Sequence, residues 1–145
     1  MFTRLMLLAA FASTWYMTGL IVFVQVVHYP LFAKIDPESF QRYHEDHVRL
    51  TTFTVLVPMV VELFASAMLA YQASAASAGL AWAGLVAVVV TWVATGLLSV
   101  PRHDKLALGF QADVHRALVG TNRVRLVAWI VHSVIMSVII ANNVK

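Results

Sequence analysis

The chain has 145 residues, of which 61% are hydrophobic and only 12% charged, and it contains no cysteine. A soluble domain is nearer half apolar and a quarter charged, so this composition indicates an integral membrane protein built as one unit. The lack of cysteine excludes disulfides, thiolate metal ligands and thiol nucleophiles. A net charge of only +3, with basic residues flanking apolar segments, excludes nucleic acid as the expected partner and favours the lipid bilayer.

Four apolar segments are near the length of about 20 residues that a bilayer requires. They cover approximately residues 5–27, 48–71, 79–100 and 124–141. They predict an all-α fold, an integral membrane four-helix bundle, with residues 1–145 forming a single transmembrane domain. Segments two and three are joined by a short uncharged link, which is typical of a helical hairpin.

The other two connections are long and basic. Eight of the ten Lys and Arg residues lie in or beside them. The positive-inside rule therefore predicts that both connections are cytoplasmic and both termini outside.

Both long connections are predicted to be helical. Asp36 and Pro37 fit an N-cap and first turn, so a helix should run over 38–47 into the second apolar segment. In the other connection Leu106, Phe110, Val114 and Leu118 recur every four residues, which predicts an amphipathic helix on the membrane or capping the bundle.

The chain also suggests an internal two-plus-two helix repeat. Residues 14–20 (TWYMTGL) and 91–97 (TWVATGL) share five of seven positions. When Phe40 is aligned with Phe110, Glu62 falls opposite His132. The two halves would have the same orientation, related by an axis along the membrane normal, and binding sites often form between such repeats.

Histidines gather at the predicted cytoplasmic side and indicate a metal site. We expect the ligands to be His28, His44, His47 and His115. Imidazole suits iron, copper and zinc, and carboxylates extend the choice to manganese, for which Glu45, Asp46, Asp104 and Asp113 are near in sequence. The HEDH spacing is not that of a zinc protease. The alternative is that interfacial histidines contact headgroups and loop carbonyls, and His103, between Arg102 and Asp104, is interpreted as solvated.

A second candidate site lies within the bilayer. Glu62 is predicted near mid-membrane, where a carboxylate is costly and often functional. Residue counting places His132 at a similar depth, so Glu62 and His132 are candidate catalytic residues that exchange a proton. The alternative is a structural hydrogen bond between helices.

A third group opens the fourth segment. Asn122 and Arg125 fit an anion or polar substrate group held at a helix N-terminus, and Trp129 fits a pocket wall, so the three are candidate cofactor-binding residues. The alternative is a helix cap for Asn122, a positive-inside charge for Arg125 and an apolar packing or interface role for Trp129.

Four segments together resemble a known family. FVQVVHYPLF (23–32), YHEDH (43–47), VPMVVEL (57–63) and TNRVRLVAW (121–129) are similar to small bacterial four-helix membrane proteins of the anthrone-oxygenase-like type. The resemblance implies oxygenation of a polycyclic phenolic or other apolar substrate, and a location in a bacterial inner membrane. It also implies roles for His28, Asn122, Arg125 and Trp129.

The leading hypothesis is a metal-dependent membrane oxidoreductase, oxygenase-like, that acts on an apolar small molecule from the lipid phase. Haem held between histidines, for electron transfer or haem handling, is an alternative cofactor. A small transporter or proton relay using Glu62 and His132 is a further alternative, as is a structural subunit without chemistry. A bundle this thin also allows a homodimer.

Overall fold

The computed structural model describes residues 2–143, and within them every regular element is helical. The first half holds α1 (Phe2–Phe23), the π-helix η1 (Val24–His28), α2 (Tyr29–Phe32) and α3 (Pro37–Tyr71). The second half holds α4 (Ala78–Ala94), the π-helix η2 (Thr95–Ser99), α5 (Val100–Leu106) and α6 (Ala112–Asn143). The predicted all-α class is confirmed.

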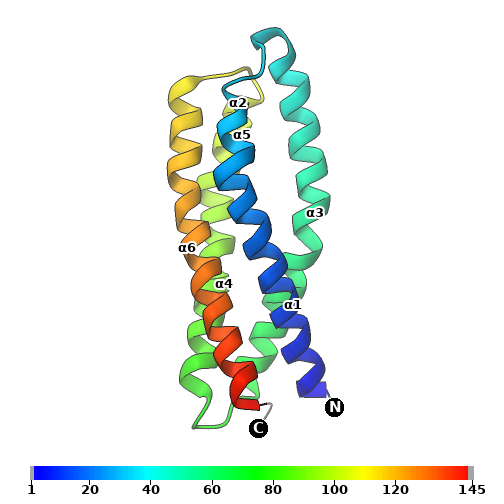
Figure 1. The fold of residues 1–145 in the computed structure, drawn as a ribbon, viewed down its shortest axis with the longest axis vertical. Helices are drawn as coiled ribbons and strands as arrows, with labels where there is room; N and C mark the ends of the chain where they lie inside the picture. The colour runs from blue at the N-terminus through cyan, green and yellow to red at the C-terminus, as the bar shows by residue number, and fades with distance from the viewer. Residues whose placement is uncertain (1, 144–145) are drawn as a thin grey trace.

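Four long helical columns lie side by side, with both chain ends at the same end of the bundle (Figure 1). Going around the bundle, α1 packs on α3, α3 on α4, α4 on α6, and α6 back on α1. Each column is long and apolar enough to cross a membrane; their bounds are Thr3–Phe32, Pro37–Tyr71, Ala78–Leu106 and Ala112–Asn143. The chain therefore forms a four-helix bundle of membrane-spanning type.

The columns extend well beyond the apolar segments seen in the sequence. α3 has 35 residues, which is about 52 Å at 1.5 Å per residue and exceeds a hydrocarbon core of about 30 Å. As predicted, α3 begins at Pro37, and the Asp36 carbonyl accepts the first backbone bonds from Ser39 and Phe40.

The predicted separate helix over 106–118 is wrong. α5 ends at Leu106, the chain turns at Gly109 with a φ of 127°, and α6 begins at Ala112 and continues into the fourth span. A positive φ of this size is accessible mainly to glycine, so Gly109 breaks the helix that the apolar pattern suggested. The pattern itself still marks inward positions, because Leu106 and Leu118 are completely buried.

The two halves repeat the same element order, a long helix interrupted by a π turn and followed by a second long helix. The π turns begin at Val24 and Thr95, 71 positions apart. Phe40 and Phe110, 70 positions apart, meet with ring centroids 5.2 Å apart. The TWxxTGL segments, 77 positions apart, are therefore out of structural register by about two turns, and that part of the predicted alignment is wrong.

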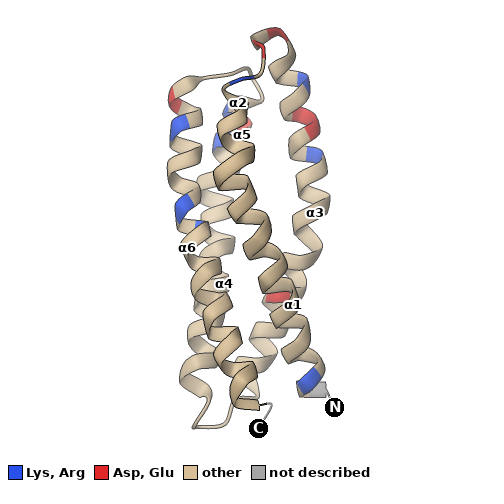
Figure 2. Ribbon diagram, viewed as in Figure 1, with Lys and Arg blue, Asp and Glu red and all other residues tan. Residues whose placement is uncertain are grey.

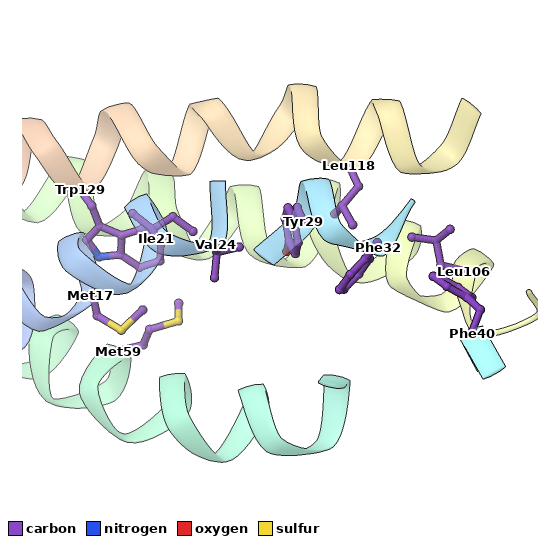
Figure 3. Close-up of a cluster of buried hydrophobic side chains, with 10 residues drawn as sticks. All are labelled: Met17, Ile21, Val24, Tyr29, Phe32, Phe40, Met59, Leu106, Leu118 and Trp129. Atoms are coloured by element: carbon purple, nitrogen blue, oxygen red, sulfur yellow. The ribbon is translucent and has the colours of Figure 1, made fainter. Parts of the chain in front are cut away.

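The outside of the bundle carries many large apolar side chains, and the interior holds polar as well as apolar side chains. Buried apolar side chains form one cluster along the upper bundle (Figure 3), made of Met17, Ile21, Val24, Tyr29, Phe32, Phe40, Met59, Leu106, Leu118 and Trp129. Ala10, Ala65 and Met136 form a second cluster nearer the termini. Lys and Arg gather mainly toward the end with the long connections (Figure 2).

Candidate functional site

Two π turns shape the end of the bundle where the histidines lie. Pro30 and Pro101 each follow a π turn by two residues. Proline has no N–H and its ring collides with the preceding turn, so the helix must widen just before it. In both turns the wide five-residue hydrogen bond forms, from Tyr29 N–H to the Val24 carbonyl and from Val100 N–H to the Thr95 carbonyl. Such widened turns are frequent at functional sites.

Four histidines from three elements meet beside these turns: His28 from η1, His44 and His47 from α3, and His103 from α5. Their ring centroids are 4.6 Å apart for His28–His47, 5.2 Å for His44–His103, 5.3 Å for His47–His103 and 6.1 Å for His44–His47. We call these four residues the histidine group.

Two direct imidazole–imidazole hydrogen bonds join the group. His28 Nε2 lies 2.7 Å from His47 Nδ1, and His44 Nε2 lies 3.0 Å from His103 Nδ1. Tyr29 Oη is 3.0 Å from His103 Nε2, and Thr51 Oγ1 is 3.1 Å from His47 Nδ1. A hydroxyl next to each pair therefore fixes how one ring is turned.

Three of the four predicted ligands, His28, His44 and His47, lie together in the structure. The fourth, His115, lies outside the group, and His103 takes its place. His115 donates from Nε2 to the Tyr29 carbonyl at 2.8 Å and packs against Phe110 and Phe32. The interpretation of His103 as solvated is wrong, because it is half-buried and hydrogen-bonded at both nitrogens.

The acidic residues near in sequence do not join the group. Glu45, Asp46, Asp104 and Asp113 are exposed, and Asp46 pairs with Arg49 at 2.7 Å. The donor set that the fold offers is therefore imidazole alone.

The four imidazoles of the histidine group do not surround a common point in the structure. Within residues 2–143, no three or more His, Asp or Glu side chains are placed so that they could hold a metal ion. Two features nevertheless show that hydrogen bonds alone do not satisfy these rings. His44 Nδ1 is buried without a partner, and His47 Nδ1 is shared between two partners although a ring nitrogen has one proton or one lone pair.

A small cavity adjoins the group on the side of the bundle interior. Its volume is about 20 Å³. Tyr29, His47, Thr51 and Arg125 provide its polar lining, and the apolar lining is Met17, Leu20, Ile21, Val24 and Val55. A larger pocket of about 640 Å³ lies at the opposite end, near Thr3, Arg4 and Gln72, and contains no histidine.

Arg125 and Asn122 form a buried polar patch with η2. Arg125 Nη1 donates to Ser99 Oγ and to Asn122 Oδ1, both at 3.3 Å, and Asn122 Nδ2 donates to Gln25 Oε1 at 3.0 Å. The predicted helix N-terminus at Asn122 is wrong, because α6 begins ten residues earlier at Ala112. The guanidinium of Arg125 instead lies over the Trp129 ring, 5.2 Å from its centroid.

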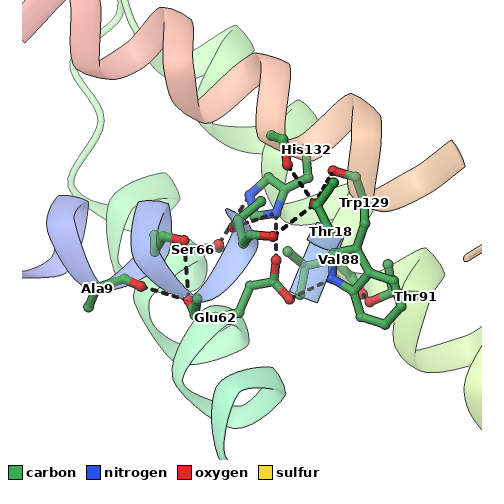
Figure 4. A network of polar contacts seen from close by, with 12 residues as sticks. Ala9, Thr18, Glu62, Ser66, Val88, Thr91, Trp129 and His132 are labelled. Carbon is green, nitrogen blue, oxygen red and sulfur yellow. Dashed lines mark hydrogen bonds and ion pairs between the residues drawn. The ribbon is translucent and has the colours of Figure 1, made fainter. Parts of the chain in front are cut away.

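Glu62 and His132 form the predicted pair, completely buried between α3 and α6 (Figure 4). Glu62 Oε1 is 3.0 Å from His132 Nδ1, and Glu62 Oε2 accepts from Trp129 Nε1 at 3.0 Å. His132 also contacts Thr14 Oγ1 at 3.2 Å and Ser66 Oγ at 3.5 Å. The pair lies 70 positions apart, the same spacing as Phe40 and Phe110, so both pairs meet where the two halves of the repeat face each other.

Trp129 was predicted to form a pocket wall, but its neighbours in the structure are Glu62 and Arg125. It does not line the small cavity; its indole N–H holds Glu62 and its face carries Arg125. It connects the two polar regions along α6.

No protein-family model, curated protein sequence or solved structure matches the chain. The resemblance to the anthrone-oxygenase-like family stays a prediction, and the site has to be interpreted from its own geometry.

Proposed function

We propose that this chain is a metal-dependent membrane oxidoreductase whose metal ion is bound by His28, His44, His47 and His103, and whose substrate is an apolar molecule from the lipid phase. The observation that carries the proposal is the meeting of four imidazoles from three separate elements, joined in two direct pairs, next to a small, largely apolar cavity.

The hydrogen bonding supports a ligand in addition to the protein. A buried polar atom without a partner costs about 1–3 kcal/mol, and His44 Nδ1 is such an atom. Apolar side chains of similar size would pack this end of the bundle at lower cost. Four histidines in contact are easier to explain if the rings bind a ligand. The hydrogen bonds between the rings would then replace the bonds to that ligand only in part.

The distances also support a metal as that ligand. Two nitrogens bound to one tetrahedral ion at about 2.0–2.1 Å lie roughly 3.3 Å apart. The paired nitrogens are 2.7 Å and 3.0 Å apart, so each pair needs to open by only a few tenths of an ångström. The two pairs would also have to turn toward a common point.

The donor set narrows the choice of metal. Imidazole nitrogen favours iron, copper, zinc and nickel over the oxygen-preferring ions, so manganese fits less well now that the nearby carboxylates are exposed. Bound iron or copper would supply one-electron chemistry. Tyr29 would orient His103 through their 3.0 Å contact at Nε2, because His103 uses Nδ1 to pair with His44. Thr51 contacts His47 at Nδ1, the nitrogen that would bind the metal, so this contact would have to open on metal binding.

The cavity supports an apolar substrate. Five of its nine lining residues are aliphatic or Met, and it lies among helices of membrane-spanning type. At about 20 Å³ it admits one small group of a ligand. A whole substrate would have to enter from the lipid side with the group to be oxidised in the cavity.

The haem alternative fits less well. His28 and His47 are in direct contact, as are His44 and His103, so a porphyrin would require the helices to separate. The Glu62–His132 pair favours a second role, proton handling or helix positioning, because both carboxylate oxygens and both imidazole nitrogens have partners in a completely buried setting.

The test is metal content and absorption of detergent-purified protein that has never met a chelator. We expect a transition metal at one per chain without a Soret band, and its loss in His28→Ala, His44→Ala, His47→Ala and His103→Ala. His115→Ala is the matched control, since His115 hydrogen-bonds a carbonyl outside the group, and it should keep the metal.

Full metal content in all four variants would refute the assignment, and so would loss in His115→Ala alone. A Soret band would favour haem. If metal is bound, oxygen consumption with apolar substrates tests the oxidoreductase part separately.

A further inference from the structure

Arg125 is a buried cation without an acidic partner. It is 7% exposed, inside the membrane-spanning helix α6. Its contacts are the hydroxyl of Ser99, the amide oxygen of Asn122 and the face of Trp129, and the phenol of Tyr29 is a further neighbour. None of these groups is a carboxylate. In residues 2–143 the ion pairs are Arg49–Asp46 and His132–Glu62, so no carboxylate lies within ion-pair distance of this guanidinium.

Neutral contacts leave part of the cost of burying the charge uncompensated. Charged side chains within membrane spans pair with an opposite charge or face a cavity, and a buried charge without a partner is strongly destabilising. Arg125 Nε adds to this, because it is buried with no hydrogen-bond partner. The guanidinium thus retains both an unneutralised charge and an unused donor.

Arg125 also lines the small cavity next to the histidine group. Tyr29, Thr51 and His47 line the same space, so the cavity has polar groups on one side and aliphatic walls on the other. Its volume of about 20 Å³ holds one water-sized atom, for which roughly 10–15 Å³ is enough. The space beside Arg125 fits a halide ion or a single oxygen of a larger anion.

We infer that Arg125 and this cavity form an anion-binding site, which takes a monatomic anion or the negatively charged oxygen of an otherwise apolar molecule. The inference of an anion site depends only on Arg125 and the cavity beside it. The further statement that this oxygen belongs to the substrate, positioned beside the metal ligands, rests on the proposed function. Arg125 is then a residue that selects amphiphilic anions over neutral hydrocarbons.

The first experiment measures thermal stability in detergent against anion concentration at constant ionic strength. Sodium gluconate, too large and hydrophilic for the cavity, is replaced stepwise by bromide or, in a second series, by micromolar decanoate. A ligand that binds only the folded state raises the apparent Tm with its concentration. We expect this rise for the wild type in at least one series.

Two variants separate the site from general salt effects. Arg125→Gln should abolish the rise or weaken the apparent affinity at least roughly tenfold, and in gluconate it should be no less stable than the wild type because an uncompensated charge is removed. Arg123→Gln removes the same charge from an exposed position two residues away and should behave as the wild type.

A second readout does not depend on a stable glutamine variant. In a Trp15→Phe/Trp82→Phe/Trp92→Phe background, Trp129 is the remaining indole, and its face contacts Arg125. Bromide bound at the cavity should quench its fluorescence saturably. Arg125→Lys, which keeps the charge but not the planar group stacked on the indole, should shift that saturation to higher bromide.

The outcomes are distinct. A response to bromide indicates a site for free anions, and a response to decanoate alone indicates an amphiphile's carboxylate. No response in either series and unsaturable quenching, or equal responses in the Arg125→Gln and Arg123→Gln variants, would overturn the inference. Metal content is measured on the same samples, so a failed metal assignment with an intact anion response, or the reverse, is seen directly.

Discussion

Replacing Glu62 tests whether the buried network between α3 and α6 holds the bundle together. Glu62→Leu keeps the volume roughly constant and removes both carboxylate oxygens. Trp129 Nε1 then loses its partner at 3.0 Å, while His132 Nδ1 loses Glu62 but keeps Thr14 Oγ1 at 3.2 Å.

The expected cost follows from these contacts. Leaving the Trp129 donor unsatisfied costs about 1–3 kcal/mol, and losing the charge-assisted bond to His132 costs about 1.5–3 kcal/mol. Their sum agrees with the 3–5 kcal/mol typical of breaking a buried pair. Because Thr14 still serves His132, we expect the free energy of unfolding to fall by about 3 kcal/mol, at the lower end of that range.

Glu62→Gln should cost less, about 1–2 kcal/mol. The amide oxygen can accept from Trp129, and the amide N–H can donate to His132 Nδ1 if that ring moves its proton to Nε2, which faces Ser66 Oγ at 3.5 Å. Glu45→Leu, an exposed position on the same helix, is the matched control and should change stability by less than about 0.5 kcal/mol.

The assay is unfolding by SDS in mixed micelles, followed by far-UV circular dichroism so that changes at Trp129 do not affect the signal. Glu62→Leu should lower the free energy of unfolding the most, Glu62→Gln should lower it less, and the control Glu45→Leu should lower it the least. The reasoning fails if Glu62→Leu lies within 1 kcal/mol of the wild type. A glutamine variant as unstable as the leucine variant would show that charge, rather than hydrogen bonding, governs the pair.

Substitutions at two other positions, Tyr29 and Gly84, test the surroundings of the histidine group and of the Glu62–His132 pair. Tyr29→Phe removes the hydroxyl 3.0 Å from His103 Nε2 and should weaken metal binding about 10–100-fold with the fold retained; an unchanged affinity in competition with a chromophoric chelator would contradict this orienting role. At Gly84 an added Cβ would lie 3.4 Å from His132 Cδ2 and Nε2, so Gly84→Ala should be tolerated, while Gly84→Leu should cost about 1–3 kcal/mol. Gly96→Leu, with nothing within 4 Å, is its control in the same unfolding assay and should cost little.

Much of the fold could be predicted because the signals are local. The need for about 20 apolar residues per span fixes the number of helices, and Asp36-Pro37 fixes the start of α3. The repeat aligned on Phe40 and Phe110 also placed Glu62 opposite His132, since the two halves face each other at that spacing. The segment over 106–118 could not be predicted in the same way, because its apolar pattern suits both one helix and the two helix ends that the turn at Gly109 makes.

The candidate site was only partly predictable. The prediction grouped His28, His44 and His47 correctly. As the fourth member it named His115, whereas the structure has His103. Both lie near a helix end on the same side, and sequence distance does not say which one turns inward. The repeated Pro30 and Pro101, each following a π turn, were a usable signal that the two turns are equivalent and that the residues near Pro101 belong to the site.

By itself, the sequence determined an all-α bundle of membrane-spanning helices, the concentration of histidine and positive charge at one end, and the opposition of Glu62 and His132. Only the tertiary structure decided which histidines meet, that Arg125 faces a cavity rather than a helix end, and that Trp129 holds Glu62. The physical reason is rotation: one extra residue in a π turn turns every later side chain by about 100° around its helix. Hydropathy does not record such a turn, although it decides which polar groups face the interior.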